Sequence, residues 1–227
     1  MTSQGAQATK EWQDRAFAEG WVASDQFEGL LGLPRRIAAA LVSSDRPGST
    51  LVLDVASGPG AFLTAMLEEL PAARGIWSDA SAAMADEAKK RLSGFAERVE
   101  FKEADMTDLP AAGLPSGIDA IVTSRAAHHL DRVELGRFYT QCAELLAPGG
   151  WLVNLDHIGP SELWDRRLRA VRPRFVPASA EGPKHHHNYP LTSVSDHIAA
   201  YLEAGIDDVE VVWRGFYTCL FMGRKSD

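Results

Sequence analysis

Short apolar runs alternate along the chain with segments in which apolar residues recur every three or four positions. The runs predict buried strands at residues 51–55, 74–78, 99–104, 117–124 and 151–158. The segments between them have the spacing of helices at residues 61–70, 81–92 and 130–147. The first run, LVLDV, contains a single charge at Asp54, which is typical of a strand buried on both faces in a parallel sheet.

The same pattern predicts helices on both sides of this central region. Residues 10–42 have helical spacing that is interrupted near residues 29–34, so Arg35 and Arg36 are expected to open a second helix. Residues 161–172 predict a basic amphipathic helix. Residues 193–205 predict a last helix, capped by Ser193 or Thr192, and two strands follow it around residues 214–215.

Small residues follow the first strand at Ala56, Ser57, Gly58 and Gly60. They allow a sharp turn and leave room for a ligand to lie against the backbone. The helix that follows begins with free amide groups, which suits the anionic or polar part of a nucleotide-like ligand. The turn lacks the Gly-Lys-Ser/Thr ending of a P-loop and the third glycine of the dinucleotide fingerprint.

The pattern D-x-x-x-G-x-G, from Asp54 to Gly60, resembles the first motif of class I S-adenosylmethionine (SAM) methyltransferases. SDASAAM, after the second strand, looks like the second motif, and LLAPGGWLV looks like a late signature of the same enzymes. The resemblance implies an α/β, Rossmann-like fold: a seven-stranded, mostly parallel sheet with helices on both faces and an antiparallel last strand. It also implies an N-terminal helical lid. We therefore expect a cap at residues 1–45 and a methyltransferase domain at residues 46–227, with a substrate-recognition insertion at about residues 159–190.

Two acids at strand ends are the main cofactor candidates. Asp79 lies about twenty residues after the glycine turn, where a carboxylate can accept both ribose hydroxyls; the alternative is a helix-capping aspartate. The resemblance places the adenine amine at Asp105 and the adenine ring at the amide of Met106, although Asp108 is close enough to replace Asp105.

The remaining cofactor candidates come from the turn, the strand ends and the N-terminal helices. Trp21 belongs to a group of aromatic residues that either covers the cofactor or closes the edge of the core. Arg35 or Arg36 can pair with a ligand carboxylate, and surface solvation is expected for at least one of them. The full set of predicted cofactor-binding residues is Asp54, Ala56, Gly58, Gly60, Asp79, Ala80, Asp105, Met106, Ser124 and Trp21.

Histidines are the catalytic candidates, because a neutral imidazole can accept a proton near pH 7. Adjacent His128 and His129 cannot both point into a pocket on regular backbone, and we expect His128 to do so. At the end of the fifth strand, Asp156 and His157 are substrate-side candidates or simply a polar strand end.

Three successive histidines at residues 185–187 have three interpretations: a metal site, a substrate contact or proton relay, or a structural role. We take His187 as a further catalytic candidate. His157, His186 and His187 are weak metal candidates, because consecutive histidines on regular backbone do not converge on one ion. A metal site is therefore the least favoured of the three interpretations.

Composition and net charge limit the classes of partner and the cellular location that we expect. The 227-residue chain carries a formal net charge of -8, so we expect no nucleic-acid partner. No apolar run reaches membrane-spanning length, and no apolar signal core begins the chain. The two cysteines make no metal-ligand spacing and indicate reduced thiols in a cytoplasmic protein, either a monomer or a homodimer.

The resemblance implies transfer of a methyl group from SAM, leaving S-adenosylhomocysteine, to a small-molecule acceptor, with secondary metabolism as a candidate context. A tRNA- or protein-directed methyltransferase that uses a basic face at residues 166–174 is the first alternative. A SAM-binding protein without turnover is the second.

Overall fold

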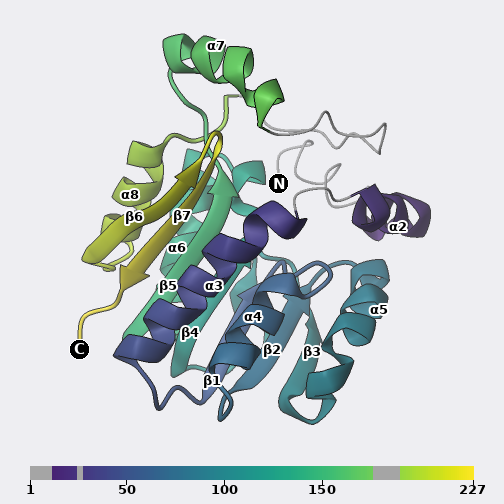
Figure 1. The fold of residues 1–227 in the computed structure, drawn as a ribbon. Helices are drawn as coiled ribbons and strands as arrows, with labels where there is room; N and C mark the ends of the chain where they lie inside the picture. The colour runs from purple at the N-terminus through teal and green to yellow at the C-terminus, as the bar shows by residue number, and fades with distance from the viewer. Residues whose placement is uncertain (1–11, 25–27, 176–189) are drawn as a thin grey trace.

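A computed structural model describes residues 12–24, 28–175 and 190–227. In this part of the chain one seven-stranded sheet has the order β3-β2-β1-β4-β5-β7-β6 (Figure 1). The strands are β1 (Leu51–Val55), β2 (Arg74–Asp79), β3 (Val99–Glu103), β4 (Ile118–Ser124), β5 (Leu146–His157), β6 (Asp208–Gly215) and β7 (Thr218–Arg224).

The strand directions are those implied by the resemblance to class I methyltransferases. β1 pairs in parallel with β2 and β4, β2 pairs in parallel with β3, and β4 pairs in parallel with β5. β7 is antiparallel to both β5 and β6. The predicted mostly parallel sheet with an antiparallel last strand is therefore confirmed.

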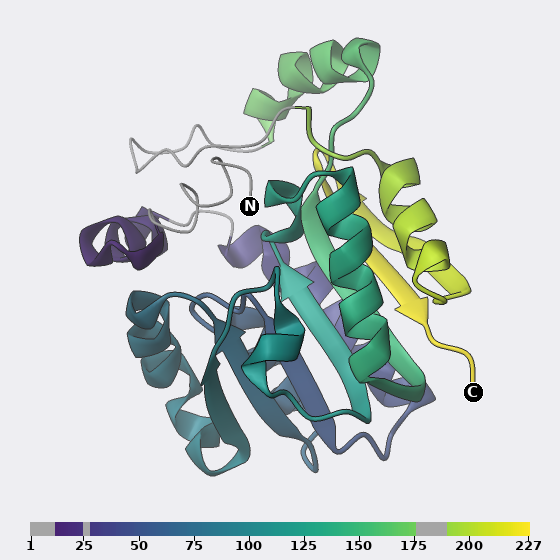
Figure 2. The ribbon, with the colours of Figure 1, turned by 180° about the vertical axis from the view of Figure 1, so that it is seen from behind.

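Helices cover both faces of the sheet, and each face has its own apolar cluster. Figure 1 shows α3 (Glu28–Asp45) and α4 (Ala61–Glu69) in front of the sheet, and α5 (Ala82–Arg91) packs into the same cluster. Figure 2 shows α6 (Arg132–Leu145) and α8 (Val194–Glu203) on the opposite face. The strands supply both clusters because alternate side chains point to opposite faces; Val52 joins the first cluster and Leu53 the second.

Other elements lie at the ends of the sheet or join its strands. They are α2 (Arg15–Ser24), the 3-10 helices η1 (Leu92–Arg98), η2 (Leu109–Ala112), η3 (Ala127–His129) and η4 (Arg172–Arg174), and α7 (Glu162–Val171). α7 is the predicted basic amphipathic helix, and none of its residues is buried. No helix in the described ranges is long and apolar enough to cross a membrane.

The predicted break near residues 29–34 is wrong, because α3 runs through Pro34. Proline removes one backbone hydrogen bond from a helix interior. The helix is nevertheless held by a buried stripe at helical spacing, Leu31, Ala38, Ala39 and Val42, each 0–1% exposed. Burial of this stripe outweighs the local cost of Pro34. Arg35 and Arg36 therefore lie within one helix and do not open a second one.

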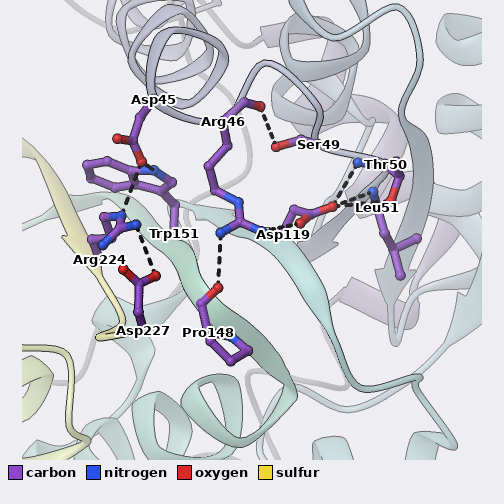
Figure 3. A network of polar contacts seen from close by, with 10 residues as sticks. All are labelled: Asp45, Arg46, Ser49, Thr50, Leu51, Asp119, Pro148, Trp151, Arg224 and Asp227. Carbon is purple, nitrogen blue, oxygen red and sulfur yellow. Dashed lines mark hydrogen bonds and ion pairs between the residues drawn. The ribbon is translucent and has the colours of Figure 1, made fainter.

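The amino ends of the central strands are joined by a polar network around Asp119 (Figure 3). One carboxylate oxygen of Asp119 accepts from the backbone amides of Thr50 at 2.7 Å and Leu51 at 3.1 Å. The other accepts from Nη2 of Arg46 at 2.7 Å, and Nη1 of Arg46 donates to the Pro148 carbonyl at 3.0 Å. The network ties β1, β4 and β5 together at the edge opposite the carboxyl ends of the parallel strands.

Candidate active site

A cavity opens at the carboxyl ends of β1, β2 and β4, the edge of a parallel sheet where ligands bind in open α/β folds. Seven of the ten predicted cofactor residues line it: Ala56, Gly58, Asp79, Ala80, Asp105, Met106 and Ser124. They follow four neighbouring strands in the sheet order β3-β2-β1-β4, so residues far apart in sequence face one space.

Asp54 does not line the cavity; it fixes the turn that does. Its buried Oδ2 accepts from the Ser57 hydroxyl at 2.6 Å and from the Leu63 amide at 3.0 Å, which fixes the turn to the first turn of α4. Burial raises the pKa of Asp54 to about 7, although both hydrogen bonds oppose the change. Gly60 also acts on the turn: its φ is +81°, and a Cβ there would lie 2.9 Å from Cδ1 of Leu92.

The turn contains an alanine in a conformation that favours glycine. Ala56 has φ +50° and Gly58 has φ +54°. An L-residue with a side chain is strained in this region, and strain of this kind is concentrated at functional sites. The turn therefore keeps its shape because Asp54, α4 and the strand end over-determine it.

Asp79 ends β2 in the cavity wall. Its Oδ2 accepts from the Gly58 amide at 2.8 Å, and its Oδ1 accepts from the Ser81 amide at 2.9 Å. The N-cap of α5 is Ser81, whose hydroxyl accepts from the Met84 amide at 3.2 Å, so Asp79 does not cap that helix. A carboxylate offers about four acceptor positions, so Asp79 retains acceptor capacity for a ligand beyond these amides.

Asp105, and not Asp108, lies on the cavity wall after β3. Oδ1 of Asp105 accepts from the amide and the hydroxyl of Thr107, both at 2.8 Å, in a local turn that fixes the carboxylate. Asp108 is exposed. Of the two acids, Asp105 is therefore the one that lines the cavity, together with Met106.

Trp12 lines the cavity on its N-terminal side; it belongs to the predicted aromatic group, in which Trp21 is the predicted cofactor-binding residue. Its carbonyl accepts from the Ser81 hydroxyl, and Nη2 of Arg15 contacts Oδ2 of Asp86, so the chain around α2 is attached to α5. The side chain of Trp21 lies outside the described residues. Helical spacing in the sequence could not decide which of Trp12 and Trp21 lines the cavity, because both belong to the same predicted helical segment.

The two adjacent histidines have exchanged the places expected for them. His129 lines the cavity. His128 is 1% exposed and lies behind it, with Nδ1 at 2.6 Å from Oδ1 of Asp156 and its amide donating to Oδ2 at 3.0 Å. The two rings are 4.2 Å apart between centroids. The expectation that His128 faces the cavity is wrong. η3 is a single short 3-10 turn, and the contacts with Asp156 hold the His128 ring in the core, away from the cavity.

The other histidine candidates do not line the cavity within the described residues. His157 is at the end of β5 and its Nδ1 is 3.0 Å from Oγ1 of Thr218; its ring centroid is 5.2 Å from that of His128. His185, His186 and His187 lie outside the described residues. In residues 12–24, 28–175 and 190–227, no group of three or more His, Cys, Asp or Glu side chains is placed to hold a metal ion.

A buried polar chain behind the cavity was not predicted. Nδ2 of Asn154 donates to the hydroxyl of Tyr139 at 2.8 Å, and this hydroxyl oxygen lies 2.7 Å from Nδ1 of His197. Nε2 of His197 lies 3.0 Å from Oγ1 of Thr192. Burial lowers the pKa of His197 to about 4, which keeps the ring neutral. The residues of this polar chain come from β5, α6, α8 and the segment before α8, so no local sequence pattern connects them.

Comparisons with known proteins find methyltransferases. Residues 52–150 match the methyltransferase domain family. A 3-amino-4-hydroxybenzoate 4-O-methyltransferase from Streptomyces cremeus is 32% identical over 115 residues, which are 50% of this chain and 30% of that protein. A 3-hydroxy-5-methyl-1-naphthoate 3-O-methyltransferase from Streptomyces sahachiroi is 30% identical over 153 residues, 63% of this chain and 43% of that protein. The chain spans less than half the length of these two relatives.

Solved structures show the same fold. An O-methyltransferase family 2 protein from Planctomyces limnophilus, in complex with apigenin, aligns with a TM-score of 0.67 at 22% identity, over 99% of this chain and 67% of that one. An O-methyltransferase family protein from Burkholderia thailandensis aligns with a TM-score of 0.66 at 21% identity, over 90% of this chain and 60% of that one. Residues 52–150 are thus similar in sequence to a methyltransferase domain, and the chain shares the fold of these solved structures.

Proposed function

We propose that the chain transfers a methyl group from SAM to a hydroxyl group of a small aromatic molecule in secondary metabolism. The observation that carries the proposal is the row of groups at the sheet edge. Asp105, Asp79, the Ala56–Gly58 turn and Ser124 follow neighbouring strands and face one cavity. This row offers acceptors to an adenosyl group at one end and a polar wall to its amino-acid part at the other.

The residues present fit the cofactor. Asp79 has acceptor capacity for ribose hydroxyls, and Asp105 is fixed beside Met106. The hydroxyl of Ser124 is buried in the cavity wall and has no hydrogen-bond partner among the described residues, so a bound polar ligand would satisfy it. When bound, SAM supplies an already activated methyl group, and the protein's contribution is mainly proximity and alignment.

His129 is placed to accept the proton of the acceptor hydroxyl, because it is the histidine of the pair on the cavity wall. His128 and Asp156 act behind it as positioning residues: the carboxylate holds both the ring and the backbone of His128. The acceptor oxygen gains the methyl group, and its proton passes to the imidazole and then to solvent. The names of the two Streptomyces relatives, which methylate hydroxyl groups of aromatic acids, support a phenolic acceptor.

The alternative of a tRNA- or protein-directed methyltransferase that uses the basic face of α7 has less support. On α7, Arg169 pairs with Asp165 at 2.7 Å and Arg166 lies 3.9 Å from Glu162, so acids on the same helix partly neutralise its basic face.

Both cysteines are buried and reduced, which supports a reducing compartment such as the cytoplasm.

Calorimetry with S-adenosylhomocysteine tests the cofactor. We expect binding to the unaltered chain, a loss of about 100-fold in affinity for Asp79→Ala, and no change for Asp108→Ala, since hydrogen bonds to a charged group contribute about 1.5–3 kcal/mol each. Absence of binding to the unaltered chain would refute the proposal. Transfer of labelled methyl groups to hydroxyaryl acids, crude RNA and protein then separates the acceptors, and tight binding without any transfer would indicate a protein that binds SAM without turnover.

A further inference from the structure

Apolar side chains are exposed along α7 and the 3-10 turn η4 that follows it. Trp164, Leu168, Val171 and Phe175 recur every three or four residues, so they form one stripe on this segment, the α7 stripe. Trp164 is 55% exposed and Phe175 is 71% exposed, and neither α7 nor η4 contains a buried residue. An apolar stripe at helical spacing normally packs on a core, whereas this one lies at the surface.

α7 is held at the edge of the sheet where the cavity opens. It follows β5, which is parallel to β4, and Figure 1 shows it beyond the carboxyl ends of these strands. The hydroxyl of Tyr217, in the β6–β7 turn, donates to Oδ1 of Asp165 at 3.1 Å. Phe216 in the same turn has its ring centroid 6.1 Å from that of Phe175. These contacts fix the helix while most of the α7 stripe stays uncovered.

Positive charge accompanies the stripe. Residues 162–175 contain five arginines and two acids, a net charge of +3 in a chain whose formal net charge is -8. Cζ of Arg167 lies 5.1 Å from the ring centroid of Trp164, and Cζ of Arg174 lies 6.0 Å from that of Phe175. Guanidinium groups are therefore placed directly beside the exposed aromatic rings of the stripe.

This combination matches the chemistry of an anionic lipid surface. A helix that lies in a bilayer interface buries Trp, Phe and aliphatic side chains at the boundary of headgroups and acyl chains, while its arginines reach the lipid phosphates. RNA would also attract arginines and stack on aromatic rings, but it does not require the aliphatic side chains of Leu168 and Val171 in the same stripe. The segregation of apolar and charged positions therefore favours lipid over RNA.

We propose that α7 and η4 dock the protein on the surface of an anionic lipid bilayer, with the α7 stripe inserted into the interface. The contact is peripheral, because the ten residues of α7 are too few to cross the hydrocarbon core. Docking through α7 brings the cavity edge of the sheet close to the lipid surface. The proposal does not depend on the identity of the methyl acceptor.

Co-sedimentation of the full chain with lipid vesicles tests the proposal. One set of vesicles is phosphatidylcholine alone, and the other is an equal mixture of phosphatidylcholine and phosphatidylglycerol. We expect binding to the mixture to be at least about tenfold tighter than to phosphatidylcholine, because each arginine near an anionic surface strengthens attachment. Added salt should reduce this preference by screening the charges.

Substitutions then locate the contact. Trp164→Ala combined with Phe175→Ala removes both exposed rings, and we expect it to weaken binding to the mixed vesicles by at least about tenfold. Leu33→Ala combined with Val133→Ala is the matched control, because it shortens two exposed apolar side chains on α3 and α6. This control should bind as the unaltered chain does.

The arginines are tested in the same way. Arg167→Gln combined with Arg174→Gln should remove most of the preference for the anionic mixture. Arg36→Gln combined with Arg137→Gln removes two exposed arginines of α3 and α6 and should leave the preference unchanged.

Trp164→Phe gives a reading that does not depend on weakened binding. The chain has six tryptophans, so the contribution of Trp164 is the difference between the unaltered chain and this variant. Brominated phosphatidylcholine in the mixed vesicles should quench tryptophan fluorescence of the unaltered chain, and part of that quenching should be absent in Trp164→Phe although the variant still binds.

Three results would overturn the proposal. The first is absence of binding to the mixed vesicles at low salt, and retention of tRNA in that case would assign the arginines of α7 to RNA instead. The second is equal binding to both kinds of vesicle, or an equal effect of the α7 substitutions and their controls. The third is unchanged quenching in Trp164→Phe, which would show that another part of the surface contacts the lipid.

Discussion

Nδ1 of His128 lies 2.6 Å from Oδ1 of Asp156, and the backbone amide of His128 donates to the second oxygen of the same carboxylate at 3.0 Å. One acid at the end of β5 thus fixes both the ring and the main chain of η3. Because η3 also contains His129, this buried contact sets the position of the histidine on the cavity wall.

Alanine substitutions should separate the two histidines. His128→Ala leaves the buried Asp156 carboxylate without its imidazole, so we expect a loss of about 3–5 kcal/mol in unfolding free energy together with a loss of turnover. His129→Ala removes a partly exposed ring, so we expect it to reduce turnover by about 100-fold or more while costing less than about 1 kcal/mol of stability. Urea unfolding and methyl-transfer rates measure both effects, and unchanged turnover in His129→Ala would exclude it as the base.

Asp54 should make stability depend on pH. Its folded pKa of about 7 lies above its ordinary value of 3.8, so its contribution to stability is fully present below about pH 4 and is lost as the pH rises through 7. The loss is at most on the order of 4 kcal/mol. Asp54→Asn does not titrate, so the unfolding free energy of the unaltered chain should fall relative to this variant between pH 4.5 and 8. Parallel pH profiles of the two proteins would contradict the raised pKa.

His197 should give the opposite dependence. Burial lowers its folded pKa to about 4, against the charges of Asp156 and Asp196, while the unfolded chain titrates near 6.5. The stability that the neutral ring contributes is present above pH 6.5 and is lost as the pH falls toward 4, by about 3 kcal/mol at most. We expect the stability advantage of the unaltered chain over His197→Gln to shrink between pH 7.5 and pH 5. A constant difference would show that His197 is already protonated or solvated in the folded state.

Ala56 should accept glycine without loss. Its φ of +50° costs an L-residue about 1–2 kcal/mol, and relief of this strain offsets the greater entropy that glycine gives the unfolded chain. We expect Ala56→Gly to be between equal in stability and about 1 kcal/mol more stable. Ala65→Gly, inside α4, is the control and should lose about 1 kcal/mol. Equal losses in thermal unfolding would argue against a strained turn.

Local patterns were sufficient for much of the fold. β2 occupies the predicted residues, Ser81 and Ser193 cap the predicted helices, and the antiparallel end of the sheet follows from the recognised motif order. The strand and the two caps depend on side-chain period and on residues a few positions apart, which the sequence records directly, whereas the antiparallel end was implied by the resemblance. Asp79 and Asp105 also follow from sequence, because the end of a parallel strand always faces the same edge of the sheet.

The sequence by itself thus located most of the strands and the acids that follow them, and the resemblance to class I methyltransferases implied the strand directions; β5 starts at Leu146, five residues before the predicted strand. The tertiary structure alone decided that α3 continues through Pro34, that His129 and not His128 reaches the cavity, and that Arg35 is turned inward while Arg36 is exposed. Each of these outcomes depends on burial against residues distant in the chain: the core under α3, and Asp156, which follows His128 by 28 residues. Local preference is worth at most a few kcal/mol at such positions, and packing and buried hydrogen bonds are large enough to reverse it.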